Sequence, residues 1–214
     1  MRMICNLFDL SGRLYRVEQV GDVFTENGLK DETLFNPART MPLVMINEIK
    51  VLADPATLAK HICRHYNLEQ MYPLATNMDR ERQKIDQILE VVYLHFKRAA
   101  DRLVKLTIQD RALAANKITL TAQQLAEKDS ALAYEKNVVK EAIMRTVEQW
   151  LNETETSYLV SDKVSAADLA VWHEIMQTMT FGELMIDAAE FPRLFEWYTW
   201  IEQTWTAGQL KGKT

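Results

Sequence analysis

Residues that break helices are missing from the middle of this chain. Of the 214 residues, six are glycine and five are proline, and none of them lies between Leu74 and Phe181. A stretch of this length without either residue excludes an architecture of strands and tight turns and predicts a run of long helices. The five tryptophans all follow residue 149, so the two ends of the chain are built differently.

Cysteine is scarce, and long apolar runs and an excess of basic charge are missing. The two cysteines, Cys5 and Cys63, cannot build a disulfide framework, so we expect a reducing, cytoplasmic compartment. The longest apolar run, Met41 to Ile46, is too short to cross a membrane, and the N-terminus lacks the layout of a secretory signal. The formal net charge of -5, from 25 Lys and Arg against 30 Asp and Glu, argues against a nucleic-acid partner.

Short β segments are predicted in the first fifty residues. Residues 14–20 alternate between apolar and polar side chains and predict a strand. Residues 43–46 and 49–52 are joined by Asn47-Glu48 and predict a β-hairpin. A two-residue type I′ turn prefers glycine in its second position, where this sequence has Glu48.

A helix is predicted directly after this hairpin. Asp54 suits the N-cap and Pro55 suits the first turn, and we expect the helix to run to about Tyr66. The segment that follows contains Tyr72-Pro73 and predicts a linker.

The chain beyond the linker predicts amphipathic helices. One starts at about Asp79, a second runs from about Thr121 to Leu151, and a third starts at Phe191-Pro192. The side chains predicted to face inward are Ile85, Ile88, Leu89, Val92, Phe96, Leu103 and Val104 in the first helix, Leu125, Leu132, Val139, Ile143, Val147 and Trp150 in the second, and Leu194, Trp197, Tyr198 and Ile201 in the third.

Ser165-Ala166-Ala167-Asp168 has the spacing of a capping box. The Ser165 side chain can accept a hydrogen bond from the Asp168 amide while Asp168 reaches back to the Ser165 amide. The pattern predicts a helix start, and it makes Ser165 and Asp168 structural rather than catalytic.

This order of elements resembles the glutathione transferase family, and four segments carry the resemblance. Residues 35–44 resemble the family's "NP...VP" stretch, in which the second proline is cis before the third strand. Residues 52–55 stand where the family has an acidic residue and a serine, and residues 72–89 resemble its linker and fourth helix, with a spacing closest to the theta class. Residues 158–170 are the most specific segment, because they resemble "YLxGDxxSxADL" with Ser161 in place of the glycine.

The resemblance implies an α/β domain followed by an all-α domain. The expected organisation is a truncated thioredoxin-like N-terminal domain over residues 1–66, a linker over residues 67–78 and an all-helical C-terminal domain over residues 79–214. Enzymes of this family add the glutathione thiolate to hydrophobic electrophiles, so glutathione is the implied co-substrate, no metal is implied, and a homodimer is the expected assembly.

The resemblance also implies a set of glutathione contacts. These are Arg39, Thr40, Met41, Pro42 and Asp54. Met41-Pro42 is the best-preserved contact, because a cis proline exposes the preceding backbone N–H and C=O to a peptide-like ligand. Arg39 suits a carboxylate as a fork donor, or it is an ordinary solvated arginine.

Two of the implied contacts have structural alternatives. Asp54 recognises the amine of glutathione, or it spends its carboxylate on capping its own helix. Tyr93 lines the hydrophobic substrate pocket, or it is an aromatic residue at the domain interface.

The catalytic hydroxyl of the family has no counterpart in the alignment. Residues 2–10 align with the later half of the family's first helix, so the first strand and the hydroxyl that follows it fall before Met1. Ser11 and Tyr15 come after that helix, in the wrong place to replace the hydroxyl. No catalytic residue is therefore predicted.

The histidines of the sequence do not form a recognisable metal-binding motif. His61 and His65 lie four residues apart with Cys63 between them, but the glutamate and third ligand of a zinc-protease motif are missing, so a solvated helix face is the simpler interpretation. His173 is expected to be a buried, hydrogen-bonded structural residue.

Two functions stay open at this point. The first is a theta-like glutathione transferase. The second is a non-catalytic transferase-fold scaffold, as in the translation elongation factor gamma subunit, with a protein partner at the edge of the hairpin, because an unpaired strand edge invites another chain.

Overall fold

Helices dominate the part of the chain that the structure describes, which is residues 44–46, 50–52 and 55–211 of a computed structural model. The chain divides into two compact units, one formed by residues 1–69 and 205–214 and the other by residues 70–204. The strand predicted at residues 14–20 lies outside the described residues. The domain boundaries predicted from the sequence stay a prediction.

Among the described residues, the first unit contains a hairpin, one complete helix and the last residues of the C-terminal helix. β1 (Val44–Ile46) and β2 (Lys50–Leu52) pair antiparallel, with Val44 opposite Leu52 and Ile46 opposite Lys50, where the sequence predicts a hairpin. α3 (Pro55–His65) follows and begins at the predicted proline. The chain leaves α3 through a turn in which Asn67 takes a positive φ of 51°, a conformation that asparagine tolerates better than most residues.

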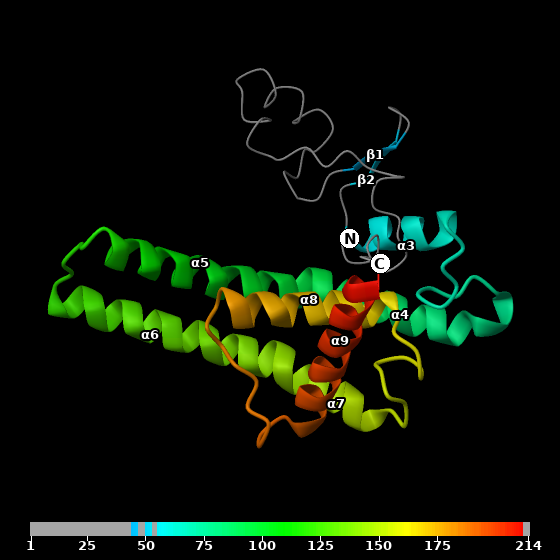
Figure 1. The fold of residues 1–214 in the computed structure, drawn as a ribbon. Coiled ribbons are helices and arrows are strands. Elements are labelled where there is room, and N and C mark those ends of the chain that lie inside the picture. Colours follow the sequence, from blue (N-terminus) through cyan, green and yellow to red (C-terminus); the bar gives the residue numbers. More distant parts are fainter. Residues whose placement is uncertain (1–43, 47–49, 53–54, 212–214) are drawn as a thin grey trace. The chain divides into compact units, whose positions relative to one another are not determined.

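The second unit begins with two long helical rods. After a short turn, η2 (Thr76–Met78), the first rod consists of α4 (Asp79–Val91), the π-helical segment η3 (Val92–Phe96) and α5 (Lys97–Ala115). The second consists of α6 (Ala122–Val139), the π-helical segment η4 (Lys140–Arg145) and α7 (Thr146–Glu153). Both starts agree with the sequence prediction, and α5 and α6 lie side by side (Figure 1).

The start of α6 shows why the second rod begins where it does. The Thr121 hydroxyl accepts a hydrogen bond from the Gln124 amide at 3.3 Å, and the Gln124 side chain accepts one from the Thr121 amide at 3.0 Å. This capping box satisfies two amides that the first turn of a helix leaves without partners. Lys117, in the preceding turn, has a positive φ of 53°.

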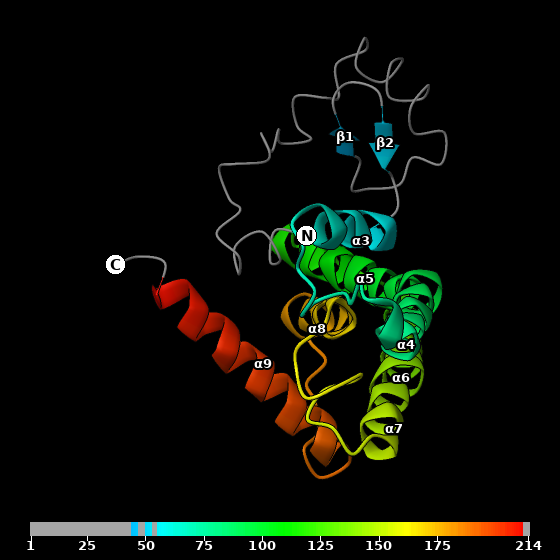
Figure 2. The ribbon, with the colours of Figure 1, turned by 90° about the vertical axis from the view of Figure 1, so that its right-hand side faces the viewer.

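α8 (Ala166–Thr180) packs against α4, η3 and α5, and α9 (Pro192–Lys211) follows a loop. Figure 2 shows α8 beside α4 and α5. α8 is apolar around most of its circumference, which suits a helix covered on several sides. The core of this unit includes Ile85, Phe96, Leu103, Ile143, Val147, Leu151, Leu159, Val171, Ile175, Phe191 and Leu194, all of them buried.

One side chain predicted to face inward does not. Leu125 is 46% exposed, because it lies near the start of α6, in the half of the α5–α6 pair that extends beyond α8 (Figure 1). There α6 lies against α5, which covers one strip of its surface. Periodicity indicates which residues share a face, but it does not say how far along the helix a neighbour reaches.

Distant residues hold the start of α9. Glu148 of α7 accepts hydrogen bonds from the amides of Arg193 at 3.3 Å and Leu194 at 2.7 Å. A carboxylate at a helix N-terminus satisfies free amides and interacts favourably with the helix dipole. The predicted proline therefore starts α9, and a residue from another helix supplies the cap.

Candidate functional site

The implied glutathione contacts lie in the part of the chain without a described structure. Arg39, Thr40, Met41, Pro42 and Asp54 all fall outside the described residues. Their neighbours along the chain are described: β1 begins two residues after Pro42, and α3 begins directly after Asp54. The five contacts stay predictions.

Tyr93 lies on the π-helical segment between α4 and α5. It is half-buried, whereas its neighbours Val92 and Phe96 are buried in the core and His95 is exposed. Phe96 stacks on Trp150 with ring centroids 5.6 Å apart, which fixes the orientation of this segment against α7. π-helical turns are frequent at functional sites, and this one holds Tyr93 partly open to solvent.

Cys63 and its flanking histidines lie on α3. Cys63 is buried, and burial raises the pKa of its thiol to about 11, so the sulfur is protonated and a poor nucleophile at neutral pH. The rings of His61 and His65 are stacked with centroids 5.9 Å apart. The rings of His65 and Tyr66 are T-shaped with centroids 4.7 Å apart. Within the described part of the chain no three His, Cys, Asp or Glu side chains gather as metal ligands would.

The capping box at Ser165 and Asp168 is present and forms the centre of a larger network. Asp168 is fully buried. Its Oδ2 accepts hydrogen bonds from the Ser165 amide at 2.9 Å and the Ser165 hydroxyl at 2.7 Å. Its Oδ1 accepts from the Leu159 amide at 2.9 Å and from the Trp197 indole at 3.0 Å. Because a carboxylate has about four acceptor positions, this network leaves none for a substrate.

The electrostatics of Asp168 agree with a structural role. Burial raises the pKa of its carboxyl, and the hydrogen bonds from Leu159, Ser165 and Trp197 oppose that shift. The group links three segments: the loop before α8, the start of α8 and the second turn of α9. The Asp168 carboxylate therefore stabilises the fold through the hydrogen bonds that it accepts.

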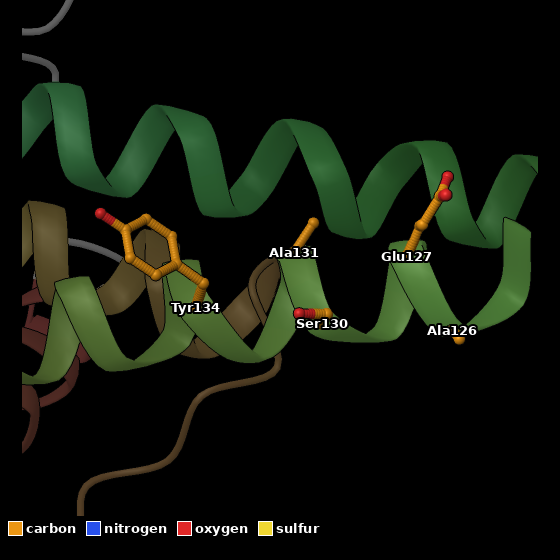
Figure 3. Close-up of a pocket in the computed structure, with 5 residues that line it drawn as sticks. All are labelled: Ala126, Glu127, Ser130, Ala131 and Tyr134. Carbon is orange, nitrogen blue, oxygen red and sulfur yellow. The ribbon is translucent and has the colours of Figure 1, made fainter. Parts of the chain in front are cut away.

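A shallow hollow of about 570 Å³ lies on the outer face of α6 (Figure 3). Its lining is made of Ala126, Glu127, Ser130, Ala131 and Tyr134, all of them exposed. Glu127 and the Tyr134 ring both extend away from the helix, and Tyr134 is 66% exposed. The sequence prediction did not single out this face, because it lacks the large apolar side chains at helical spacing that such a prediction looks for.

Sequence reasoning also missed Glu174. It lies on α8 and is 6% exposed, and its Oε2 has no hydrogen-bond partner among the described residues. Burial raises the pKa of its carboxyl to about 7. The available signal was its isolation: between Asp168 and Thr180, Glu174 is the one acidic residue of an otherwise largely apolar helix.

His173, next to Glu174, differs from expectation. It is exposed rather than buried, and its Nε2 lies 2.8 Å from the side-chain amide of Gln177. Both burial and a hydrogen bond were expected for His173; the hydrogen bond is present, but the burial is not. The reason is rotation around the helix axis: the adjacent Trp172 and Glu174 face the packed sides, which leaves His173 outward.

Comparisons with known proteins identify the helical part. Residues 113–205 match the family model described as "Glutathione S-transferase, C-terminal domain". The match covers α6, α7, α8 and the capping box, where the sequence resemblance is most specific. No curated protein sequence matches the chain significantly.

Solved glutathione transferases have the same fold. A diazinon-metabolizing glutathione S-transferase of the silkworm Bombyx mori matches 96% of this chain and 86% of its own at 14% identity, with a TM-score of 0.62. A beta-class enzyme of the bacterium Sphingomonas chungbukensis matches 90% and 83% at 16% identity, with a TM-score of 0.58. A delta-class transferase of Nilaparvata lugens matches 98% and 88% at 13% identity, with a TM-score of 0.59.

These structures show a glutathione transferase fold with an all-helical C-terminal domain. Bacterial beta-class and insect delta-class enzymes match about equally well, so the likeness does not select a class. None of the described helices combines the length and the hydropathy that crossing a membrane requires.

Proposed function

We propose that this chain, which carries a glutathione S-transferase C-terminal domain over residues 113–205, binds glutathione and conjugates it to hydrophobic electrophiles in the cytoplasm. The family-model match is the observation that carries the proposal. The transferase fold supports it, because the likeness to the silkworm enzyme extends over 96% of the chain.

The proposed glutathione contacts are those that the sequence resemblance implies. Arg39 holds a glutathione carboxylate as a two-pronged donor. Thr40 and the Met41 backbone, ahead of Pro42, pair with the peptide part, and Asp54 receives the amine. Tyr93, half-buried on its π-helical turn, borders the electrophile.

The proposed reaction is a nucleophilic attack by the glutathione sulfur on an electrophilic carbon, by addition or by substitution. The glutathione thiol loses its proton to solvent and its sulfur forms a bond to the electrophilic carbon. In a substitution the leaving group departs with its electron pair, and in an addition the displaced electron pair takes up a proton from solvent. The thiolate is the reactive form. Theta-like classes, which the spacing over residues 72–89 favours, stabilise it with a hydroxyl, and we assign that role to no residue of this sequence.

Self-association is part of the proposal. The outer face of α6 presents a hollow of small side chains next to the exposed Tyr134 ring (Figure 3). A knob and a hole on one helix face suit a two-fold homodimer, because each copy offers both to the other. Sedimentation of the wild type and of Tyr134→Glu tests this, with Glu196→Gln as a control on an exposed position of α9.

A second candidate function is a scaffold without conjugating activity. β1 and β2 pair with each other and with no further strand among the described residues. Their outer edges suit an added strand from a protein partner. In that case the chain keeps the transferase fold but neither binds nor consumes glutathione.

Titration with glutathione during thermal unfolding tests the proposal. A ligand at 100 times its dissociation constant stabilises the folded state by about 2.7 kcal/mol. We expect a rise in melting temperature that saturates with glutathione, followed by consumption of the thiol when an aryl halide is added. No shift at millimolar glutathione would favour the scaffold, and a shift without thiol consumption would show binding without catalysis.

Variants locate the binding site. Arg39→Gln should weaken glutathione binding about tenfold or more, since a hydrogen bond to a charged group contributes about 1.5–3 kcal/mol. Arg98→Gln is the matched control, because Arg98 is an exposed arginine on α5. Equal affinities of Arg39→Gln and wild type would exclude Arg39 from the site.

A further inference from the structure

Glu174 is a buried carboxyl in the seam between α8 and α5. Three residues within one helical turn of Glu174 on α8 have an exposed fraction of 0%: Val171, Ile175 and Thr178. Glu174 itself is 6% exposed, and its Oε2 has no hydrogen-bond partner in the described structure. An ionised carboxylate with an unpartnered oxygen in such a place is costly, so the uncharged acid is favoured.

An ion pair lies beside it at the start of α5. Lys97 Nζ is 3.2 Å from the Asp101 carboxylate, one helical turn further on. Both charges act on Glu174, the lysine favouring its ionised form and the aspartate opposing it. Lys97 and Asp101 are partly open to solvent, so Lys97 is able to exchange one carboxylate for another.

Two charged groups, Lys97 and Asp101, contribute to the pKa of Glu174. On α4, Lys84 interacts electrostatically with Asp168. Asp168 lies six residues before Glu174 on α8, which is about 9 Å along the helix axis. On η3, His95 is exposed, and on α8 itself His173 is exposed and bonded to Gln177. The local charge balance of Glu174 is therefore set by Lys97 and Asp101.

We propose that Glu174, Lys97 and Asp101 form a proton-controlled latch between α8 and the start of α5. With a proton on Glu174, the acid is packed uncharged in the seam and Lys97 pairs with Asp101. When the proton leaves to solvent, the Glu174 carboxylate competes with Asp101 for Lys97, and the seam loosens because the second carboxylate oxygen has no donor. The latch adjoins η3, which carries Tyr93 and also packs on α8.

The direction of the pH effect follows from proton binding. The folded state holds the proton of Glu174 up to about pH 7, whereas an unfolded glutamate releases it near pH 4.5. Between these values the folded state binds one proton more, so the unfolding equilibrium constant contributed by this group rises about tenfold per pH unit. The contribution is fully present below about pH 4.5 and is lost as the pH rises toward 7.

The experiment compares urea unfolding of the full chain at closely spaced pH values between 5 and 8. Tryptophan fluorescence follows the helical unit, because Trp150, Trp172, Trp197 and Trp200 lie within residues 70–204. Wild type should show a one-proton slope that Glu174→Gln lacks. Glu196→Gln, an exposed control on α9, should keep the wild-type slope.

Two variants of the ion pair should give opposite shifts of the Glu174 midpoint, which a glutamate remote from this ion pair would not show. Asp101→Asn removes a repelling charge and frees Lys97, so Glu174 should lose its proton at lower pH. Lys97→Gln removes the attracting charge, so the proton should leave at higher pH. Carbon-13 NMR of the glutamate side-chain carboxyl groups reads these midpoints directly in the folded protein, even where a variant is less stable.

The outcomes are decisive. A resonance that is missing in Glu174→Gln, titrates near pH 7 in wild type and moves in opposite directions in the two ion-pair variants supports the latch. A Glu174 midpoint near 4.5, equal slopes for wild type and Glu174→Gln, or shifts of the same sign would overturn it. These readouts need no glutathione, so they are independent of the proposed function.

Discussion

Trp197 donates its indole N–H to the buried carboxylate of Asp168 at 3.0 Å, joining the second turn of α9 to the start of α8. The same carboxylate holds the loop before α8 through the Leu159 amide. A residue that a local motif requires for starting one helix thus also fixes a second helix and a loop. The helical unit depends on this one side chain in three places.

Asp168→Asn should destabilise the helical unit by about 2–4 kcal/mol. The asparagine NH₂ would face either the Ser165 donors or those of Leu159 and Trp197, so buried donors would oppose one another and stay unpaired. Urea unfolding followed by tryptophan fluorescence measures the loss. Asp162→Asn, at an exposed aspartate that accepts one hydrogen bond from the Ser157 amide, should cost about 0.5 kcal/mol or less; similar losses for both variants would contradict the role of the network.

Glu148→Ala should lower stability by about 1–2 kcal/mol, because it removes the cap of α9. The amides of Arg193 and Leu194 would lose their acceptor at the positive end of the helix dipole. Thermal unfolding monitored by circular dichroism measures the change. Glu153→Ala, at an exposed glutamate at the end of the same helix, is the control and should be close to neutral; an unchanged melting temperature for Glu148→Ala would show that water replaces the cap.

Gly182→Ala should cost about 1–3 kcal/mol through overpacking. A Cβ at this position would lie 2.6 Å from the Thr178 carbonyl oxygen and 2.9 Å from Leu103 Cδ2. The leucine can move but the carbonyl belongs to the last turn of α8, so the loop after α8 has to shift. Adding Leu103→Ala should therefore relieve only part of the strain, and a double-mutant cycle from urea unfolding measures the coupling. A fully additive cycle would rule out the contact with Leu103.

Cys63 should make the stability of the folded protein fall at alkaline pH. Its thiol has a pKa of about 11 in the folded state against 9.0 for an ordinary cysteine, so the folded state holds one proton more between these values. The contribution is complete below about pH 9 and is lost as the pH approaches 11. In a Cys5→Ser background, iodoacetamide at pH 8 should label Cys63 at least tenfold more slowly in the native protein than in urea. Equal labelling rates would show that the thiol is exposed in the native state.

Glu174 and His173 show where the sequence prediction ended. Both lie in a segment whose helical start follows from Ser165 and Asp168 alone, because a capping box is a contact between residues three apart. Which side of α8 is covered depends on where α4 and α5 pack, and the sequence of α8 itself does not contain that information. His173 was therefore expected inside and lies outside, whereas the burial of Glu174 had no local signal.

The sequence by itself determined that long helices occupy most of residues 74–181, where α4, α6, α8 and α9 start, and the resemblance to glutathione transferases. These features depend on interactions within one or two helical turns, which a linear pattern records. Only the tertiary structure decided that Glu148 caps α9, that Trp197 reaches Asp168, that Leu125 stays exposed and that Glu174 is buried without a partner for Oε2 among the described residues. Each of these depends on which distant helix lies alongside and how far it extends, and burial and hydrogen bonding follow from that packing.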